Sequence, residues 1–313
     1  MGKRVIPREA FAQHEKRAAR IRECLVDMLE EVPAKKIAIP LSSGVDSHAI
    51  LFAALEAKKQ PTIYSITLDD RESQDFRGAR RTSEILGLPF VPVILPTKVS
   101  EIKRFISEEI YGPINPGIVI TKATAECLWP VARLFDKVTE KAIVTGFNGD
   151  TWYCTLRSQK KVYDAEGNAG YQRIVRQYFD NFNGAKMNDP ARMMQLGYLK
   201  RYKPGVKLYV PYNDPRMFQV MKGMDPIKEG WRPIQKAPVR LAFFDYFEKC
   251  RESVYIHSPM QKGDSGIEEH FHKLLDTDLN TQGYKSTIGI YNTFLRKWQA
   301  EYLRRRTPSI FEK

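Results

Sequence analysis

Residues 42–47, Ser-Ser-Gly-Val-Asp-Ser, carry groups that together could bind the phosphates of a nucleotide. The apolar run 37–40 precedes this loop and an apolar helical pattern follows it, so the loop joins a strand to a helix. A helix start offers unpaired backbone N–H groups and a partial positive charge, which favour an anion. Ser42 and Ser47 add hydroxyl donors, and Gly44 permits close approach of the backbone. Asp46 supplies a carboxylate suited to Mg2+, so the loop predicts a phosphate and magnesium site, with an ordinary strand-to-helix turn as the alternative.

The same loop excludes one class of nucleotide site. No lysine follows it, so it is not the G-x-x-x-x-G-K-[ST] loop that acts on a γ-phosphate. It resembles the S-G-G-x-D-S loop of the ATP pyrophosphatase (PP-loop) superfamily, whose enzymes cleave ATP between the α and β phosphates. Ser43 stands where that family has its first Gly. The resemblance implies that the residues binding ATP and its pyrophosphate are Ser42, Ser43, Gly44, Val45, Asp46 and Ser47.

A second candidate lies at residues 145–150, Thr-Gly-Phe-Asn-Gly-Asp, at the end of the apolar run 141–145. Two glycines and an Asp at the end of a strand suit a phosphate or Mg2+ contact facing Asp46, although a plain turn is the alternative. The segment resembles the S-G-E-G-A-D-E turn of asparagine synthetases, whose Asp binds magnesium. The resemblance places Asp150 at that position as a second metal ligand and Gly146 in the pyrophosphate site.

Two substitutions in this turn leave the general base open. Phe147 replaces the Glu that assists proton transfer in the synthetases, and Thr151 replaces the following Glu. A phenyl ring cannot accept a proton, so the base must be another group or the nucleophile itself. Tyr153 is a nearby candidate, for which packing is the favoured role.

Two later segments extend the resemblance. Residues 208–214, LYVPYND, resemble the R-V-P-F-L-D segment of asparagine synthetases. Residues 232–242, RPIQKAPVRLA, resemble their T-K-x-x-L-R-E-A segment, which carries the catalytic lysine. The match assigns that lysine to Lys236, whereas a lysine taken alone is more typical of a solvated surface. Order and spacing agree from residue 35 to about 260; position 2 is Gly rather than a nucleophilic Cys, so no glutaminase domain is expected.

The resemblance implies an ATP-dependent ligase that uses Mg2+. A substrate carboxylate would attack the α-phosphorus of ATP, and pyrophosphate would leave into the 42–47 loop. Asp46 and Asp150 would hold Mg2+, with Asp46 and Lys236 as the catalytic residues. An amine would then take the acyl group from AMP to form an amide. The expected partners are therefore a small carboxylate and an amine.

Two other functions remain open. The net charge of +13 and a basic, aromatic run favour an ATP-dependent enzyme that modifies a nucleic acid or nucleoside. That run comprises Tyr171, Arg173, Arg176 and Tyr178. The cysteines form no C-x-x-C pair, which counts against a thiolation enzyme. The third function is nucleotide binding without catalysis, against which Asp46 and Lys236 argue.

The patterns around these motifs predict an α/β fold with a parallel twisted sheet covered by helices on both faces, and a mainly helical C-terminal part. Strands are expected at 37–40, 62–67, 90–95 and 141–145. Helices are expected at 8–31, 46–58, 73–86, 99–110, 121–138, 171–181 and 187–200. We expect a helical lead-in at 1–34, a nucleotide-binding core at 35–155, and a helical substrate or cap region at 156–313 that returns the lysine to the site.

The composition indicates in which cellular compartment the protein is expected. No apolar run approaches the roughly 20 residues of a membrane span, and the N-terminus lacks the apolar segment of a secretory signal. The four scattered cysteines are typical of reduced, buried thiols, so we expect a cytoplasmic protein without a membrane partner. His270 and His272, two residues apart, would point to different faces of a helix and are expected at the surface.

Overall fold

A five-stranded parallel sheet organises the computed structural model, which describes residues 7–110, 122–154, 157–182, 194–231, 233–255, 263–271 and 273. The strands are β1 (Lys36–Pro40), β2 (Gln60–Leu68), β3 (Phe90–Leu95), β4 (Ala142–Val144) and β5 (Lys207–Tyr209). Their order in the sheet is β3-β2-β1-β4-β5, and each neighbouring pair is parallel. The α/β fold with a parallel sheet predicted from the sequence is confirmed.

The strand order creates a switch point between β1 and β4. From β1 the chain moves outward through β2 to β3, and it then returns to place β4 on the other side of β1. Ala38 pairs with Thr62 of β2 on one side and with Ile143 of β4 on the other. Connections that leave in opposite directions open a crevice beyond the carboxyl ends of these two strands, which is where open α/β sheets bind ligands. The loops 42–47 and 145–150 begin there.

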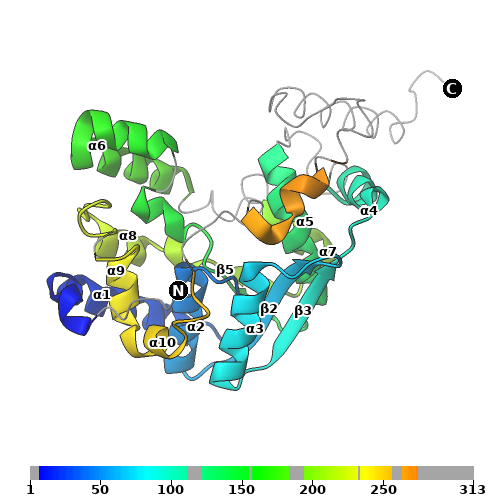
Figure 1. The fold of residues 1–313 in the computed structure, drawn as a ribbon, viewed down its shortest axis with the longest axis horizontal. Coiled ribbons are helices and arrows are strands. Elements are labelled where there is room, and N and C mark those ends of the chain that lie inside the picture. The colour runs from blue at the N-terminus through cyan, green and yellow to red at the C-terminus, as the bar shows by residue number, and fades with distance from the viewer. Residues whose placement is uncertain are drawn as a thin grey trace.

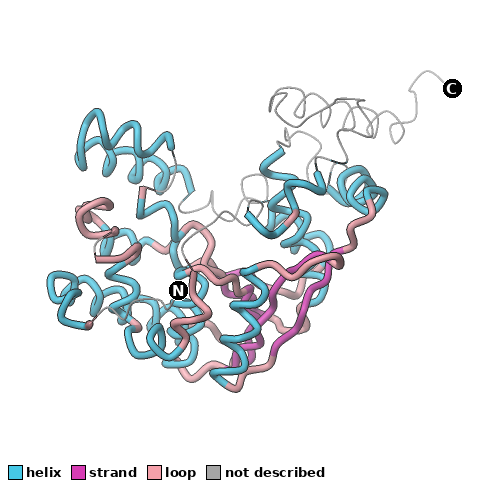
Figure 2. Tube along the Cα trace, in the orientation of Figure 1, coloured by secondary structure: helices cyan, strands magenta, loops and turns pink. Residues whose placement is uncertain are grey.

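Helices cover one face of the sheet with a core that joins early and late parts of the chain (Figures 1 and 2). These helices are α1 (Glu15–Glu30), α2 (Val45–Glu56), α3 (Gln74–Leu86), α8 (Pro215–Met221), α9 (Ala237–Ala242) and α10 (Phe244–Lys249). Ile37 and Ile39 of β1 point into this core, together with Phe52 of α2 and Val239 of α9. α9 packs against both α1 and α2, so the segment that carries Lys236 is docked beside the start of α2.

The opposite face of the sheet is covered by α4 (Val99–Arg104), the π-helical turn η2 (Phe105–Ile110), α5 (Lys122–Lys137) and α7 (Met194–Tyr202). Ala38 and Ile143 point to this side, as the alternation of side chains along a strand requires. Trp129 and Phe135 of α5 are fully enclosed in its core.

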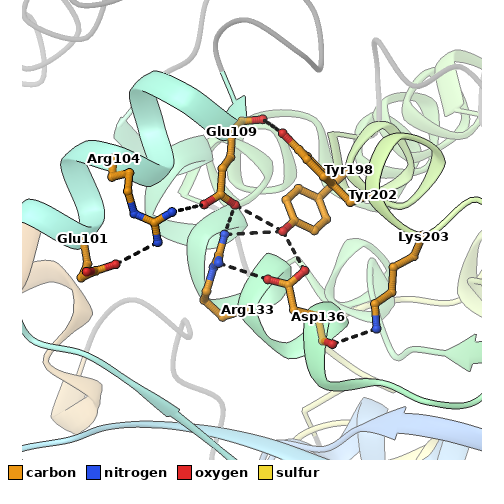
Figure 3. Close-up of polar contacts among 8 residues, drawn as sticks. All are labelled: Glu101, Arg104, Glu109, Arg133, Asp136, Tyr198, Tyr202 and Lys203. Atoms are coloured by element: carbon orange, nitrogen blue, oxygen red, sulfur yellow. Dashed lines mark hydrogen bonds and ion pairs between the residues drawn. The ribbon is translucent and has the colours of Figure 1, made fainter.

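A polar network ties α5, η2 and α7 together above this core (Figure 3). Arg133 of α5 pairs with Glu109 of η2, and its other guanidinium nitrogen lies 3.1 Å from Asp136. Tyr198 of α7 donates to Asp136 Oδ1 at 2.8 Å, and Lys203 Nζ donates to the Asp136 carbonyl oxygen at 2.8 Å. Because α7 leads directly into β5, the network helps to set the position of that edge strand.

The structure differs from the sequence prediction in three elements. The predicted helix 8–31 begins as a 3-10 helix, η1 (Arg8–His14), before α1. The predicted helix 171–181 is part of a longer element, α6 (Arg157–Phe182), broken at Gly167, which has φ +66°. β5 was not predicted, because three residues that include an exposed lysine show no strand periodicity. Of the predicted helix 187–200, residues 187–193 lie outside the described residues.

Side-chain burial corrects one surface prediction and confirms another expectation. His270 is only 3% exposed and stacks on Trp129 at 6.0 Å, so it is not a surface histidine; His272 lies outside the described residues. Apolar contact with α5 outweighs the polar character of the ring. All four cysteines are free thiols; Cys24, Cys154 and Cys250 are buried as expected, whereas Cys127 is only partly buried. Among the described residues, no helix is both long and apolar enough to cross a membrane.

Candidate active site

Three residues from distant parts of the chain meet beyond the carboxyl ends of β1 and β4. Asp46 lies in the first turn of α2, Asp150 in the 3-10 helix η3 (Gly149–Tyr153) that follows β4, and Lys236 immediately before α9. Lys236 Nζ lies 2.5 Å from Asp46 Oδ2 and 2.5 Å from Asp150 Oδ1. The structure therefore brings together the three residues that the sequence assigned to catalysis and metal binding.

This cluster is buried unevenly, and burial controls its ionisation. The side chain of Lys236 is 2% exposed, that of Asp46 12% and that of Asp150 35%, so the cluster opens to solvent on the Asp150 side. Burial disfavours the ammonium of Lys236, but the two carboxylates outweigh it and raise the pKa of Lys236. Burial raises the pKa of Asp46, and the attraction of Lys236 only partly offsets it. The ammonium thus remains charged at neutral pH.

The loop before α2 places two hydroxyl groups at the helix start. Ser42 Oγ and Ser47 Oγ lie 3.2 Å apart, and Ser42 Oγ also accepts the Gly44 N–H at 3.1 Å. The first α-helical hydrogen bond in α2 runs from the His48 N–H to the Gly44 carbonyl oxygen. The N–H groups of residues 45–47 therefore belong to the first turn, where the helix supplies no acceptor four residues back. Val45 contributes through this backbone, since its side chain is in the core.

Ser43 is turned toward α3. Its N–H donates to Asp75 Oδ1 at 2.9 Å and its hydroxyl donates to the same oxygen at 2.5 Å. Asp75 lies in the first turn of α3, where a carboxylate is favoured by the helix dipole. The Ser residue at this motif position thus anchors the loop to α3, and its donors are already used within the protein.

The two glycines of the β4 turn allow it to lie directly on the start of α2. A Cβ at Gly146 would lie 2.7 Å from the Ser47 backbone nitrogen, and a Cβ at Gly149 would lie 2.3 Å from the Asp46 carboxyl carbon. Both distances are far below van der Waals contact. Gly146 therefore lets the turn pack directly against the start of α2, and Gly149 leaves the space that the Asp46 carboxylate fills.

Backbone conformations uncommon for non-glycine residues gather at this site. Lys236 has φ +58° and ψ +39°, the left-handed region, and its N–H donates to the Gly230 carbonyl oxygen. Asn148 and Cys154, which flank η3, have φ +66° and +53°. Of the described non-glycine residues, only Lys58 shares this property away from the site. Such strain is concentrated at functional sites, because the surrounding structure must hold it in place.

Two buried tyrosines, Tyr153 and Tyr212, lie near the cluster. Lys236 Nζ lies 5.4 Å from the centre of the Tyr153 ring, within range of a cation–π contact. The hydroxyls of Tyr153 and Tyr212 are buried and have no hydrogen-bond partner within the described part of the chain, and the same is true of Asp46 Oδ1. Burial raises the pKa of Tyr153 well above its usual range, so it cannot act as a base near neutral pH.

His48 is a buried residue beside the 42–47 loop that no sequence motif singles out. Its Nδ1 lies 2.9 Å from the Gly44 carbonyl oxygen, and its Nε2 lies 2.9 Å from Thr82 Oγ1. A carbonyl oxygen only accepts, so Nδ1 carries the proton and Nε2 accepts the Thr82 hydroxyl. Burial lowers the pKa of His48 to about 4. The neutral ring links the 42–47 loop to α3.

The cluster supplies two carboxylates that suit Mg2+, but it supplies no third side-chain ligand of the described chain. Mg2+ is bound in proteins by one or two carboxylates together with substrate phosphates and water. Asp46 and Asp150 supply two carboxylates around one point, and Asp46 Oδ1 is buried without a partner among the described residues. No group of three or more His, Cys, Asp or Glu side chains suited to a metal occurs in the part of the chain that the structure describes. A metal at this site would therefore depend on ligands from a bound phosphate.

Phe147 and Thr151, where the 145–151 segment differs from the asparagine synthetase turn, make structural contacts. Phe147 packs against the core that covers the α5 face of the sheet, and the Thr151 carbonyl oxygen accepts the Tyr171 hydroxyl at 2.6 Å. Tyr171 is only 1% exposed, so this member of the basic, aromatic run does not offer a ring to a nucleic-acid base. Arg173 pairs with Glu166.

Comparison of the sequence with models of known protein families gave no match, and comparison with curated proteins gave none either. Interpretation of the site therefore rests on its own residues and geometry.

Proposed function

We propose that this protein is an ATP-dependent ligase that adenylates a substrate carboxylate, releases pyrophosphate, and transfers the acyl group to an amine. The observation that carries the proposal is the meeting of Asp46, Asp150 and Lys236 at the carboxyl ends of β1 and β4. The reaction converts ATP and a carboxylate into an acyl-adenylate and pyrophosphate. Attack by the amine then gives the amide, AMP and a proton.

The start of α2 suits the leaving pyrophosphate. The hydroxyls of Ser42 and Ser47 stand beside the first-turn N–H groups of residues 45–47, and the helix dipole adds partial positive charge. Fixed donors of this kind stabilise charge that develops in a transition state without having to reorganise. Asp46 and Asp150 would hold Mg2+, which when bound neutralises charge on the phosphates.

Lys236 suits a role in the chemical steps. Its ammonium is charged, buried and held by a constrained backbone, so it can meet negative charge at the α-phosphate and later on the acyl oxygen. Tyr153 is excluded as the base by its raised pKa, and Phe147 cannot replace the synthetase Glu. The attacking amine must therefore arrive uncharged and lose its proton to a group outside this cluster or to water.

The direct test is isotope transfer. Carboxylates labelled with 18O are incubated in pools with ATP, Mg2+ and a set of amines, and the products are separated by ion-exchange chromatography. We expect AMP and pyrophosphate, with one 18O atom of the carboxylate in the AMP, because the acyl C–O bond breaks in the second step. ADP and orthophosphate as the sole products, or AMP that contains no 18O, would contradict the proposal.

A nucleic-acid or nucleoside substrate is the second candidate, and the net charge of +13 is the observation that favours it. The experiment that separates the two candidates adds short DNA and RNA duplexes and single strands to the same assay. ATP cleavage that depends on an added nucleic acid would favour the second candidate; cleavage that depends only on small acids would favour the first.

A further inference from the structure

Lysines lie at the amino-terminal ends of four neighbouring strands, at the edge of the sheet opposite the candidate active site. Lys36 begins β1 and Lys207 begins β5, Lys141 immediately precedes β4, and Lys58 lies two residues before β2. Since β2, β1, β4 and β5 are consecutive in the sheet, these four residues, here called the lysine row, follow one another across its amino-terminal edge. Neighbouring strands lie about 4.8 Å apart, so the row extends over about 15 Å.

The register of the strands places like charges next to each other. Ala38 of β1 pairs with Ile143 of β4. Two residues earlier on each strand, the same alignment brings Lys36 beside Lys141. The Lys207 N–H donates to the Lys141 carbonyl oxygen at 2.9 Å, which continues the row onto β5. Facing like charges on neighbouring strands destabilise a sheet, so strand pairing gives no reason for lysines at these positions.

No carboxylate of the described chain pairs with the lysine row. All four lysines are exposed, and within the part of the chain that the structure describes none of them forms an ion pair. The acidic residues that most closely precede β1, β2 and β4 are engaged by other groups: Glu31 by Arg216, Glu56 by Arg22, and Glu140 by the Tyr64 hydroxyl. The row therefore presents four ammonium groups that are available to an external anion.

Helix ends explain other lysines at this edge but not the lysine row. Lys59 Nζ donates at 2.6 Å to the Val32 carbonyl oxygen just after α1, and Lys203 Nζ donates at 2.7 Å to the Val138 carbonyl oxygen just after α5. Lysines near helix C-termini commonly have this structural role. Among the described residues, the side chains of the lysine row make no such hydrogen bond. Lys58 also has φ +55°, a conformation that glycine adopts with less strain.

The arrangement of the charges favours one class of partner. A regular row of single positive charges matches a chain that carries single negative charges at regular intervals, as a nucleic-acid backbone does. Binding to an anionic membrane usually adds apolar side chains that enter the lipid. The exposed large apolar side chains of the described chain are Ile94, Tyr202 and Trp231, and none belongs to these strand starts. The row contains no aromatic ring on which an unpaired base could stack, which favours a duplex over a single strand.

We propose that the lysine row binds the phosphate backbone of a nucleic-acid duplex. A duplex bound there is an anchor rather than the group that reacts, because β1 alone puts about 13 Å between Lys36 and Pro40, at the entry to the 42–47 loop. The inference stands apart from the ligase proposal, since binding at this edge needs neither ATP nor a carboxylate substrate.

The test measures binding of the full-length protein to fluorescein-labelled duplexes by fluorescence anisotropy, without ATP. A DNA duplex and an RNA duplex of the same sequence, each of about 20 base pairs, are titrated at several salt concentrations from about 50 to 200 mM NaCl. Each phosphate contact contributes about 0.9 to the slope of log affinity against log salt concentration. We expect the triple variant Lys36→Gln, Lys141→Gln and Lys207→Gln to lose about 2.7 of this slope and to bind at least tenfold more weakly. Any difference between the two duplexes identifies the preferred nucleic acid.

The matched control removes the same charge from three exposed lysines elsewhere: Lys16 of α1, Lys222 at the end of α8 and Lys249 of α10, each replaced by Gln. We expect the control to bind like the native protein. Equal weakening in the two triple variants would show that only the overall charge matters, and would overturn the inference. Failure of the native protein to bind either duplex at low salt would overturn it too.

Competition distinguishes the duplex from other polyanions. Polyglutamate and phosphatidylserine vesicles are added to the bound duplex at an equal concentration of negative charge, and we expect neither to displace it. Displacement by polyglutamate would assign the row to an acidic protein, and displacement by vesicles to a membrane; either result would overturn the inference. Because no ATP is present, these failures leave the ligase proposal untouched, and a protein that binds the duplex but never cleaves ATP would defeat only the latter.

Discussion

Lys236 occupies a conformation and an environment that a lysine adopts only at a cost. A left-handed backbone costs a non-glycine residue about 1–2 kcal/mol, and an ammonium is among the groups least often buried. The two carboxylates at 2.5 Å offset the loss of hydration, but they do not require this backbone conformation. Glycine would be less strained in this backbone conformation, so the proposed function, which uses the charge of Lys236, would account for a lysine here.

Replacing Lys236 should therefore affect chemistry more than ATP binding. A charge that meets the transition state lowers the barrier with little effect on ground-state affinity. We expect Lys236→Ala to reduce the single-turnover rate by about 100- to 1,000-fold, with a small change in the Kd of ATP. Lys236→Arg should not restore the rate, since its planar group places the charge differently. Lys228→Ala, at an exposed lysine of the same connection, is the control. A normal single-turnover rate in Lys236→Ala would show that the catalytic lysine is another one.

Substitution of Asp46 and substitution of Asp150 should have different effects on the stability of the fold. Asp46→Asn and Asp150→Asn should each abolish turnover, because either change removes a charge that would hold Mg2+. The side chain of Asp46 is 12% exposed and that of Asp150 35%, so loss of Asp46 leaves the buried ammonium less well paired. We expect Asp46→Asn to lower the free energy of unfolding by about 3 kcal/mol, and Asp150→Asn by less than half as much. Urea unfolding and a magnesium titration of activity measure both effects. Near-normal turnover in either variant would remove that residue from the site.

At the scale of elements, the site depends on contact between two turns that each follow a strand. Gly146 lies against the backbone of Asp46 and Ser47, and neither can move without displacing the start of α2. Side chains on flexible ends could adjust to a larger neighbour, but backbone atoms in a helical turn cannot. The close approach of the 42–47 loop to the turn carrying Asp150 thus depends on the absence of a side chain at Gly146.

Gly146→Ala should consequently damage both stability and nucleotide binding. Overpacking of this kind costs about 1–3 kcal/mol, and it should push Asp150 away from Lys236. Gly205→Ala is the matched control, since a Cβ there meets nothing within 4 Å. Chemical unfolding and calorimetric titration with ATP measure the outcome. If the two variants behave alike, the close approach of the two turns does not matter for function.

The network in Figure 3 provides a comparison between two arginines that share one carboxylate. Arg133 and Arg104 both pair with Glu109, but the side chain of Arg133 is 23% exposed and that of Arg104 51%. Arg133 also lies 4.8 Å above the Phe105 ring. We expect Arg133→Ala to lower the free energy of unfolding by about 1–3 kcal/mol and Arg104→Ala by less than about 0.5 kcal/mol. Equal losses in urea unfolding would show that burial does not strengthen this network.

At the scale of the whole molecule, the candidate site exists only when both ends of the described chain are folded together. Asp46 and Lys236 are 190 residues apart in sequence and meet in one hydrogen bond. α1, α2 and α9 share the core that holds them there. A ligand that binds this cluster therefore stabilises the complete fold rather than one part of it.

The stability of this fold should decline in mild acid because of His48. A buried neutral histidine with a pKa of about 4, compared with about 6.5 when unfolded, must become protonated on unfolding. The stabilisation is complete above pH 6.5 and is lost as the pH falls toward 4, and it amounts to about 3 kcal/mol. Burial of Asp46 acts with the opposite sign, because its raised pKa favours the folded state as the pH falls.

Comparison with His48→Gln separates the two contributions. The free energy of unfolding of the native protein, relative to that of the variant, should be about 3 kcal/mol lower at pH 4 than at pH 7. A difference independent of pH would mean that His48 is not buried as a neutral ring.

Most of the sheet and the first half of the site could be predicted from the sequence, because they depend on local patterns. An apolar strand, a loop of small residues and an apolar helix determine where β1 ends and α2 begins, and the predicted strands at 62–67 and 90–95 repeat this alternation. Asp46 and Asp150 follow strands that are adjacent in the sheet, so their proximity follows from parallel topology. The position of Lys236 came from a resemblance to other segments rather than from any local pattern.

Only the tertiary structure decided the partners of these residues. Ser43 binds Asp75, His48 binds Thr82, and Lys236 bridges two carboxylates, and each contact joins elements whose separation in sequence carries no periodic signal. β5 is too short to show a strand pattern, yet it leads into the turn that carries Asn213, which accepts a hydrogen bond from Asn148. Burial, which raises or lowers the pKa of each ionisable group, is a property of the whole packed molecule. The sequence by itself determined which chemical groups are present and which strand ends carry them, while packing decided which of them are charged, paired or left open to a ligand.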